Sequence, residues 1–306
     1  MLRSVILAAA RSQRVSRLVE TAPVSRSVVR RFVAGAGTTD ALRVTKELVG
    51  SGLKVTLDYL GEDTLNADQA EHTKEEYLRL LSQLADAGLT PAAEVSLKLS
   101  ALGQKFDEKL AEANARAILT AAVAAGTTVT LDMEDHTTTD STLEMLERLR
   151  VDFPMVGAVV QAYLRRTEGD CRELRLDGQR VRLCKGAYKE PESVAYQSKA
   201  DVNKSYVRCM NLLMSGPGYP MLATHDPRLI AIGEDRASWF ERSPDEFEFQ
   251  MLYGIRPEEQ RRLAAKGYTV RVYVPYGDQW YGYLMRRLAE RPANLAFFLR
   301  SFASTK

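Results

Sequence analysis

Four residues near the C-terminus have the types and the spacing to hold a small carboxylate. On an expected helix they lie at i, i+3, i+4 and i+7 and share one face: Tyr283, Arg286, Arg287 and Glu290. Adjacent guanidiniums offer forked donors that suit the acid end of an amino or imino acid. The same spacing is common on salt-bridged surface helices, and the helix alone favours that second interpretation. A binding role therefore depends on the chemical groups that the rest of the chain brings close.

The chain before this helix alternates between strand-like and helix-like patterns. Eight strand-like segments are expected, at residues 53–59, 94–99, 127–133, 156–163, 181–184, 221–224, 247–252 and 269–274. Alternating β/α units form parallel sheets, and eight is the number at which they close. The sequence thus predicts an α/β fold, a distorted (β/α)8 TIM-type barrel over residues 46–306. An open doubly wound sheet is the alternative, but the glycine-rich turn after its first strand is absent.

The C-terminal ends of the expected strands carry polar or ionisable residues. They are Lys98, Asp132, Gln161, Arg182, Lys185, Thr224, His225, Gln250 and Tyr273. Active sites of β/α barrels sit at these ends, so the side chains are expected to converge. A random set of strand ends would include several apolar residues, and the pattern therefore indicates a functional site.

Single residues of this set allow several interpretations. Lys98 could form a Schiff base, pair with Asp132 or extend along the barrel, and pairing is favoured because the two strands are adjacent. The run 132–136 is rich in acids, but the chain has only three histidines and no metal-ligand spacing, so no metal is expected. The KGAY segment at 185–188 is a weak phosphate signal. In the segment 224–226, helix capping is at least as good an interpretation as ligand binding.

Composition excludes several classes of protein. A net charge of +2 on 306 residues gives no case for nucleic acid, and no apolar run is long enough to cross a bilayer, so a soluble protein is expected. Three cysteines of irregular spacing predict neither a disulfide framework nor a zinc site and fit a reducing compartment. The arginine-rich residues 1–32 resemble a transit peptide or a membrane-surface helix, but a helical arm over residues 1–45 is favoured.

Several motifs in the right order together resemble the proline dehydrogenase family, in its short monofunctional bacterial form. They are Lys98, Asp132, RLCKGAY at 182–188, ATHD at 223–226, EFQMLY at 248–253 and YLMRRLAE at 283–290. The resemblance covers nearly the whole chain and implies an FAD-dependent barrel whose last helix lies over the strand ends. Cys184 stands where valine or isoleucine is expected, a conservative departure that should leave the site intact.

The resemblance also implies roles for individual residues. Arg286 and Arg287 are similar to the pair that binds the proline carboxylate, with Glu290 orienting them. Residues similar to those that close round the proline ring are Lys98, Asp132, Tyr188, Tyr273 and Tyr283. Positions that match flavin contacts are Met133 through its backbone, Gln161, Arg182, Lys185, Gly186, Ala187, Thr224 and His225.

The activity implied is oxidation of L-proline to 1-pyrroline-5-carboxylate, the first step of proline catabolism. Hydride would pass from proline C5 to N5 of FAD, with Arg182 favouring the reduced flavin and Asp132, paired with Lys98, controlling the proton on the ring nitrogen. A quinone would then take the electrons, which implies a cytoplasmic protein in peripheral contact with the inner face of the cell membrane. No second catalytic region is expected after Phe302. The alternatives are a Schiff-base lyase or aldolase using Lys98, and a barrel that binds carboxylates without catalysis.

Overall fold

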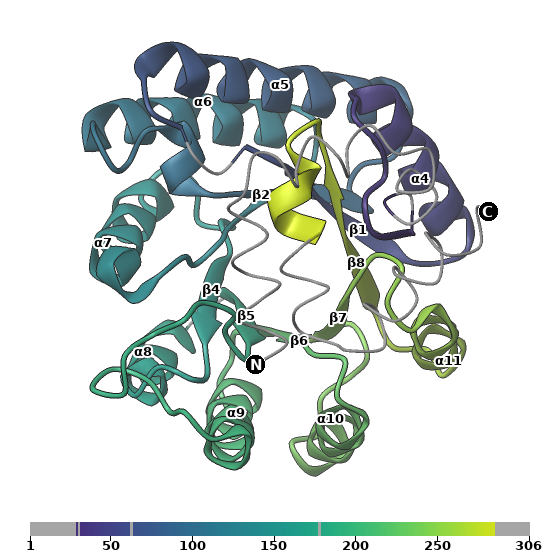
Figure 1. Cartoon of the computed structure of the whole chain (residues 1–306). Coiled ribbons are helices and arrows are strands. Elements are labelled where there is room, and N and C mark those ends of the chain that lie inside the picture. The colour runs from purple at the N-terminus through teal and green to yellow at the C-terminus, as the bar shows by residue number, and fades with distance from the viewer. Residues whose placement is uncertain (1–28, 30, 62–63, 177–178, 285–306) are drawn as a thin grey trace, which may run out of the picture.

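A computed structural model describes residues 29, 31–61, 64–176 and 179–284 (Figure 1). Most of the expected N-terminal arm lies outside the described residues. So do three residues of the expected carboxylate site, Arg286, Arg287 and Glu290.

Eight parallel strands form the barrel. They are β1 (Lys54–Tyr59), β2 (Ala93–Leu97), β3 (Val129–Leu131), β4 (Ala158–Gln161), β5 (Arg180–Cys184), β6 (Tyr219–Ala223), β7 (Glu248–Leu252) and β8 (Val270–Tyr276). The strand order is β3-β2-β1-β8-β7-β6-β5-β4, and a parallel bridge between Thr130 and Gly157 joins the two ends. A Cβ at position 157 would lie 2.8 Å from Thr130 Oγ1, so glycine permits this closure. All eight expected strands are confirmed.

Helices lie outside the strands and surround the barrel (Figure 1). The α-helices are α4 (Thr38–Gly50), α5 (Ala67–Asp86), α6 (Glu108–Ala124), α7 (Thr139–Arg150), α8 (Thr167–Leu174), α9 (Lys199–Met214), α10 (Pro227–Trp239) and α11 (Pro257–Ala265). Two short 3-10 helices are η1 (Leu99–Leu102) and η2 (His136–Thr138).

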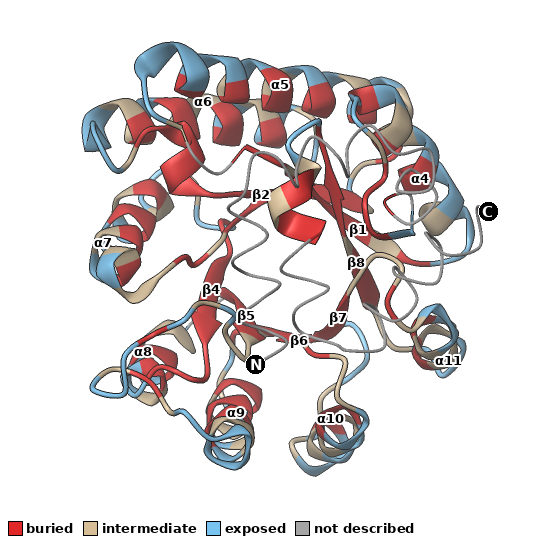
Figure 2. Ribbon diagram, in the orientation of Figure 1, coloured by how far each residue is buried: buried red, intermediate tan, exposed pale blue. Residues whose placement is uncertain are grey.

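The main hydrophobic core lies between the strands and the helices. Buried residues fill the strands and the inner faces of the helices, whereas the outer helix faces are exposed (Figure 2). Every second residue of a strand packs into this core. Examples are Val55 and Leu57 on β1 and Val270, Val272 and Val274 on β8. Burying one such aliphatic side chain contributes about 1.5–3 kcal/mol. The intervening residues point into the barrel and are mostly polar.

Side-chain caps mark the starts of α5, α6, α9 and α10. Asn66, Asp107 and Ser198 each accept a hydrogen bond from a backbone N–H in the first turn of α5, α6 and α9. Helices α4, α7, α8 and α11 have no side-chain cap, and α4 begins at Thr38 after Gly37.

The last strand is longer than the sequence pattern suggested. Expected to end at Val274, β8 continues through Pro275 and Tyr276, because these residues pair with Asp58 and Tyr59 of β1. The turn therefore starts only after Tyr276, and helix follows from residue 280. The expected order of a strand followed by a helix is confirmed.

Candidate active site

Asp132, directly after β3, is the centre of a polar cluster at the C-terminal end of the barrel. Its Oδ1 accepts from Ser96 Oγ at 2.8 Å and from Arg182 Nη1 at 2.6 Å. Its Oδ2 accepts from the Tyr273 hydroxyl at 2.7 Å. Strands β2, β3, β5 and β8 therefore meet at one carboxylate, and the predicted convergence of strand-end side chains is confirmed for this part of the set.

Lys98 has a nearer partner than the one expected. Its Nζ lies 2.7 Å from both carboxylate oxygens of Asp58, on the neighbouring strand β1, and 4.0 Å from Asp132 Oδ2. The expected pairing with Asp132 exists, but the shorter ion pair is with Asp58. The sequence analysis missed Asp58, although its place two residues after the buried Thr56 and at the end of a strand could have identified it.

Arg182 is oriented by several groups at once. Its Nε donates to Gln250 Oε1 at 2.5 Å and its Nη1 to Ser96 Oγ at 3.0 Å. The guanidinium carbon lies 5.3 Å from the centroid of the Tyr273 ring, at cation–π distance. Its Nη2 is buried with no hydrogen-bond partner in the part of the chain that the structure describes. A buried donor without a partner is costly, so this atom points to a missing acceptor.

Tyr273 is a fixed hydrogen-bond donor. Burial first, and then the carboxylates of Asp132 and Asp58, raise the pKa of Tyr273 well above its usual value. The phenol therefore stays protonated and donates to Asp132 over the whole physiological pH range.

The loop after β5 contains the KGAY segment. Gly186 has φ +100°, and a Cβ there would lie 2.2 Å from the ring of Tyr163, so its backbone rests directly on that ring. Lys185 Nζ lies 3.0 Å from Asp226 Oδ2. Burial alone would raise the pKa of the Asp226 carboxyl, but the ammonium of Lys185 lowers it. Ala187 is exposed, and Tyr188 packs beside Tyr163.

The other expected flavin positions hold neighbouring loops together. Thr224 Oγ1 accepts from the N–H of Asp226 at 3.2 Å, and Asp226 caps α10, so the capping interpretation is confirmed for Asp226. His225 Nε2 accepts from the N–H of Leu252 at 2.9 Å. Gln161 Nε2 donates to the carbonyl of Glu134 at 2.7 Å. Met133 is buried after β3, and Tyr283 is buried on the helix after β8.

The acidic run after β3 does not gather round one point. The carboxylate of Glu134 accepts from the N–H and the hydroxyl of Ser100, and Asp135 caps η2. His136 contacts Glu190 through its ring. Among the described residues, no group of three His, Cys, Asp or Glu side chains could hold a metal ion.

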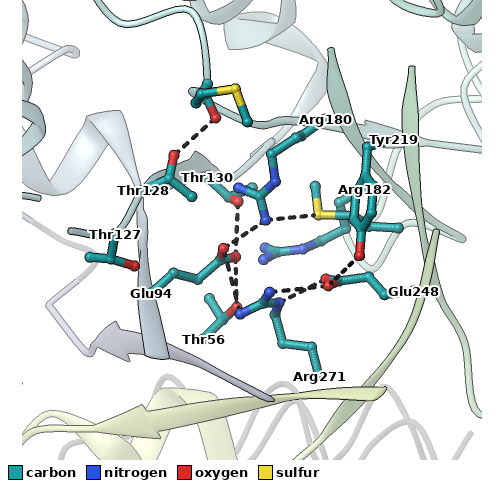
Figure 3. Close-up of polar contacts among 12 residues, drawn as sticks. Thr56, Glu94, Thr127, Thr128, Thr130, Arg180, Arg182, Tyr219, Glu248 and Arg271 are labelled. Atoms are coloured by element: carbon teal, nitrogen blue, oxygen red, sulfur yellow. Dashed lines mark hydrogen bonds and ion pairs between the residues drawn. The ribbon is translucent and has the colours of Figure 1, made fainter. Parts of the chain in front are cut away.

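A second charged cluster fills the barrel below the site (Figure 3). Arg180 Nη2 lies 2.6 Å from Glu94 Oε2, and Arg271 Nε lies 2.7 Å from Glu248 Oε1. Arg271 also reaches Glu94, at 3.5 Å. This cluster was not among the sites expected from the sequence. Its signal is polar residues at every second position of a strand, such as Arg180 before Arg182.

Comparisons with known proteins identify the family of this chain. The family model described as proline dehydrogenase matches residues 41–300. The chain is 40% identical over 300 residues to proline dehydrogenase 1 of Bacillus subtilis strain 168, covering 98% of each chain. It belongs to the proline dehydrogenase family. The proline dehydrogenase of Deinococcus radiodurans is 41% identical over 279 residues, which cover 90% of this chain and 89% of that one.

Solved structures of proline utilization A proteins share the fold. The protein from Bdellovibrio bacteriovorus, inactivated by N-propargylglycine, superimposes with a TM-score of 0.80 at 27% identity, over 92% of this chain and 34% of that one. The protein from Corynebacterium freiburgense gives a TM-score of 0.75 at 21% identity, over 98% and 34%. This chain thus spans about a third of those longer proteins.

Family membership makes this chain an enzyme, an oxidoreductase of proline catabolism. Proline dehydrogenases depend on a flavin, which the sequence resemblance also implied. None of the helices in the described part of the chain has both the length and the hydropathy to cross a membrane.

Proposed function

We propose that this protein oxidises L-proline to 1-pyrroline-5-carboxylate with FAD as its cofactor. The observation that carries the proposal is the cluster round Asp132, in which Arg182, Tyr273 and Lys98 converge at the open end of the barrel. These are residues that the family resemblance assigns to flavin and substrate. Their convergence from four different strands is what a preorganised site requires.

The residues at the strand ends fit a flavin. Arg182 carries a buried donor, Nη2, without a partner among the described residues, and a flavin ring can offer an acceptor. The backbone of Gly186 packs on the Tyr163 ring, where a Cβ would clash, and its positive φ turns the loop. Lys185, beside it, can reach a phosphate if it exchanges its contact with Asp226. The remaining contacts proposed are Met133, Gln161, Ala187, Thr224 and His225.

When bound, the flavin supplies the acceptor, at N5, for the hydride that leaves proline C5. Arg182 places a positive charge where negative charge develops on reduction. The chain orients this charge from two sides, through Asp132 and through Gln250.

We propose that the substrate is held between charged and aromatic groups. Arg286 and Arg287, oriented by Glu290, bind the carboxylate, and all three lie outside the described residues. Lys98 adds a fixed positive charge, because Asp58 holds its ammonium from one side. The phenols of Tyr188, Tyr273 and Tyr283 exclude water from the ring.

The ring nitrogen must be neutral before hydride can leave. We propose that Asp132 and Lys98, whose charged atoms lie 4.0 Å apart, control that proton. Asp132 is the more accessible of the two acids here, with a side chain 13% exposed against 1% for Asp58. A proton can therefore pass to it or to a water at its edge.

A Schiff-base lyase is the weaker candidate on the same barrel. That chemistry needs a neutral amine, whereas two carboxylates face the ammonium of Lys98 and favour its charged form. A barrel that only binds carboxylates would keep Arg286 and Arg287 but would show no redox change with proline.

The electrons must leave for a second acceptor, and we propose a quinone in the membrane. To reach a quinone in the membrane, the protein would have to contact the inner face of the cell membrane from the cytoplasm. The arginine-rich N-terminal residues are the proposed contact, because basic segments bind anionic lipid surfaces.

The first test is an absorbance spectrum of the purified protein before and after L-proline is added without an acceptor. Oxidised flavin bands that bleach with proline support the cofactor, the substrate and the reductive half-reaction together. D-proline serves as the matched control for specific recognition. A colourless protein that stays inert when FAD is supplied overturns the proposal and favours the lysine-based lyase.

A further inference from the structure

Glu190 is a buried carboxylate in the loop after β5, and no role has been assigned to it so far. Its side chain is 3% exposed. It lies five residues after Lys185, and so beyond the segment that the family motif covers. A buried carboxylate is costly unless several donors satisfy it, so its partners show what it holds.

The partners of Glu190 come from two other loops. Its Oε1 accepts from the backbone N–H of His136 at 2.9 Å, in the loop after β3, and its Oε2 contacts the Nδ1 atom of the same residue. Its Oε1 also accepts from the hydroxyl of Tyr163 at 3.2 Å, in the loop after β4. One carboxylate therefore joins the loops that follow β3, β4 and β5.

Each of these loops adjoins a proposed flavin contact. His136 lies three residues after Met133, and Tyr163 two residues after Gln161. The backbone of Tyr163 also pairs with the third loop, because its N–H donates to the carbonyl of Lys185 at 2.9 Å. Glu190 thus links the three loops that carry proposed cofactor contacts and fixes their positions relative to one another.

Tyr163 transmits the position of Glu190 to the proposed cofactor loop. The backbone of Gly186 rests on the Tyr163 ring, which leaves no room for a side chain there. The same ring belongs to a small apolar cluster that Tyr188 packs against. Burial, with Glu190 beside it, raises the pKa of Tyr163, so its hydroxyl stays a donor to that carboxylate.

We propose that Glu190 is a positioning residue for the flavin: it fixes the three loops to one another and holds the Tyr163 ring beneath Gly186. The inference rests on the proposed flavin function, which it deepens. Glu190 itself touches neither the cofactor nor the reacting atoms in this account. Its effect is on how tightly the preformed loops bind FAD.

The test compares FAD binding by apoprotein of the full chain carrying Glu190→Gln, Tyr163→Phe or both. Loss of one charge-assisted hydrogen bond predicts that Glu190→Gln raises the FAD dissociation constant about tenfold to a hundredfold. Tyr163→Phe removes one hydroxyl and should raise it about three- to tenfold. The double variant should bind less weakly than the two single losses multiplied, because both changes weaken the same contact between Tyr163 and Glu190. At saturating FAD, kcat should stay within about twofold of wild type, because the reacting atoms are untouched.

A matched control separates positioning from general stability. Glu112 is a carboxylate that also joins two elements, since it accepts from Arg116 of α6 and from Arg148 of α7, both outside the loops that Glu190 joins. Glu112→Gln should lower the melting temperature of the apoprotein without changing the FAD dissociation constant.

The outcomes are distinguishable. If Glu190→Gln lowers the melting temperature but binds FAD as tightly as wild type, Glu190 is only structural and this inference is wrong. If that variant does not fold, unchanged FAD binding by Tyr163→Phe contradicts the inference equally. A wild-type apoprotein that takes up no FAD overturns the proposed function, and this inference with it.

Discussion

The two ends of the barrel interior carry the same kind of chemistry with different access to solvent. Each holds two acids and two bases: Glu94, Glu248, Arg180 and Arg271 in the lower cluster, and Asp58, Asp132, Lys98 and Arg182 in the upper one. The lower carboxylates are 2% and 0% exposed. In the upper cluster, Asp132 and Lys98 remain 13% and 10% exposed.

This difference separates a structural charge cluster from a functional one. The lower cluster is sealed, so its ion pairs can do no more than complement one another across the barrel. The upper cluster opens toward the strand ends, so a ligand can reach its charges. Two clusters with the same numbers of acidic and cationic side chains are therefore proposed to serve stability at one end and binding at the other.

The largest expected effect is on the upper cluster. Asp132→Ala should lower the rate of proline oxidation by about 10²- to 10⁴-fold, because the proton on the ring nitrogen loses its proposed control and Arg182 loses a partner. FAD should be retained, which the flavin absorbance of the purified variant measures. Full activity of Asp132→Ala would remove Asp132 from the mechanism.

A substitution in the lower cluster should lower the stability of the folded protein. Arg271→Ala leaves Glu248 and Glu94 buried beside fewer positive charges, so the free energy of unfolding should fall by about 3–5 kcal/mol. Denaturant titration of the two proteins measures this change. Lys204→Ala, which breaks the exposed pair with Asp201, is the control and should change stability by less than about 1 kcal/mol. A similarly small change for Arg271→Ala would mean that the lower cluster is not structural.

The same cluster predicts how stability depends on pH. Burial alone would raise the pKa of Glu94, but the guanidiniums of Arg180, Arg271 and Arg182 lower it from 4.5 to about 2. Since the folded pKa lies below the unfolded one, this contribution is complete above about pH 4.5 and is lost as the pH falls toward about 2. Melting temperatures measured between pH 6 and 3 should therefore decline less steeply for Glu94→Gln than for wild type. Parallel curves would show that Glu94 does not titrate in this way.

The smallest effect separates the two acids of the upper cluster. Asp58→Asn keeps the shape beside Lys98 but removes the charge that holds it, so KM for proline should rise about tenfold while kcat changes less. Steady-state kinetics of the FAD-loaded enzyme measure both constants. If kcat falls as far as it does in Asp132→Ala, Asp58 shares the role proposed for Asp132 and the division between them is wrong.

Much of the fold was predictable because its signals are local. Alternation at every second residue and at every third or fourth marks strands and helices without knowledge of their neighbours, which is why all eight strands were expected in place. The end of β8 was misjudged, because Pro275 and Tyr276 read as a turn and only their pairing with β1 keeps them extended.

The sequence by itself determined which residues stand at the strand ends, and therefore which could meet. Only the tertiary structure decided which of them pair. Lys98 takes Asp58 as its nearer partner, and Arg180 finds Glu94, 86 residues away. A strand's periodicity tells which residues share a side, but not which side faces inward or which strand lies opposite. Closure of the barrel and the register between strands settle both, and they are set by contacts that no single segment contains.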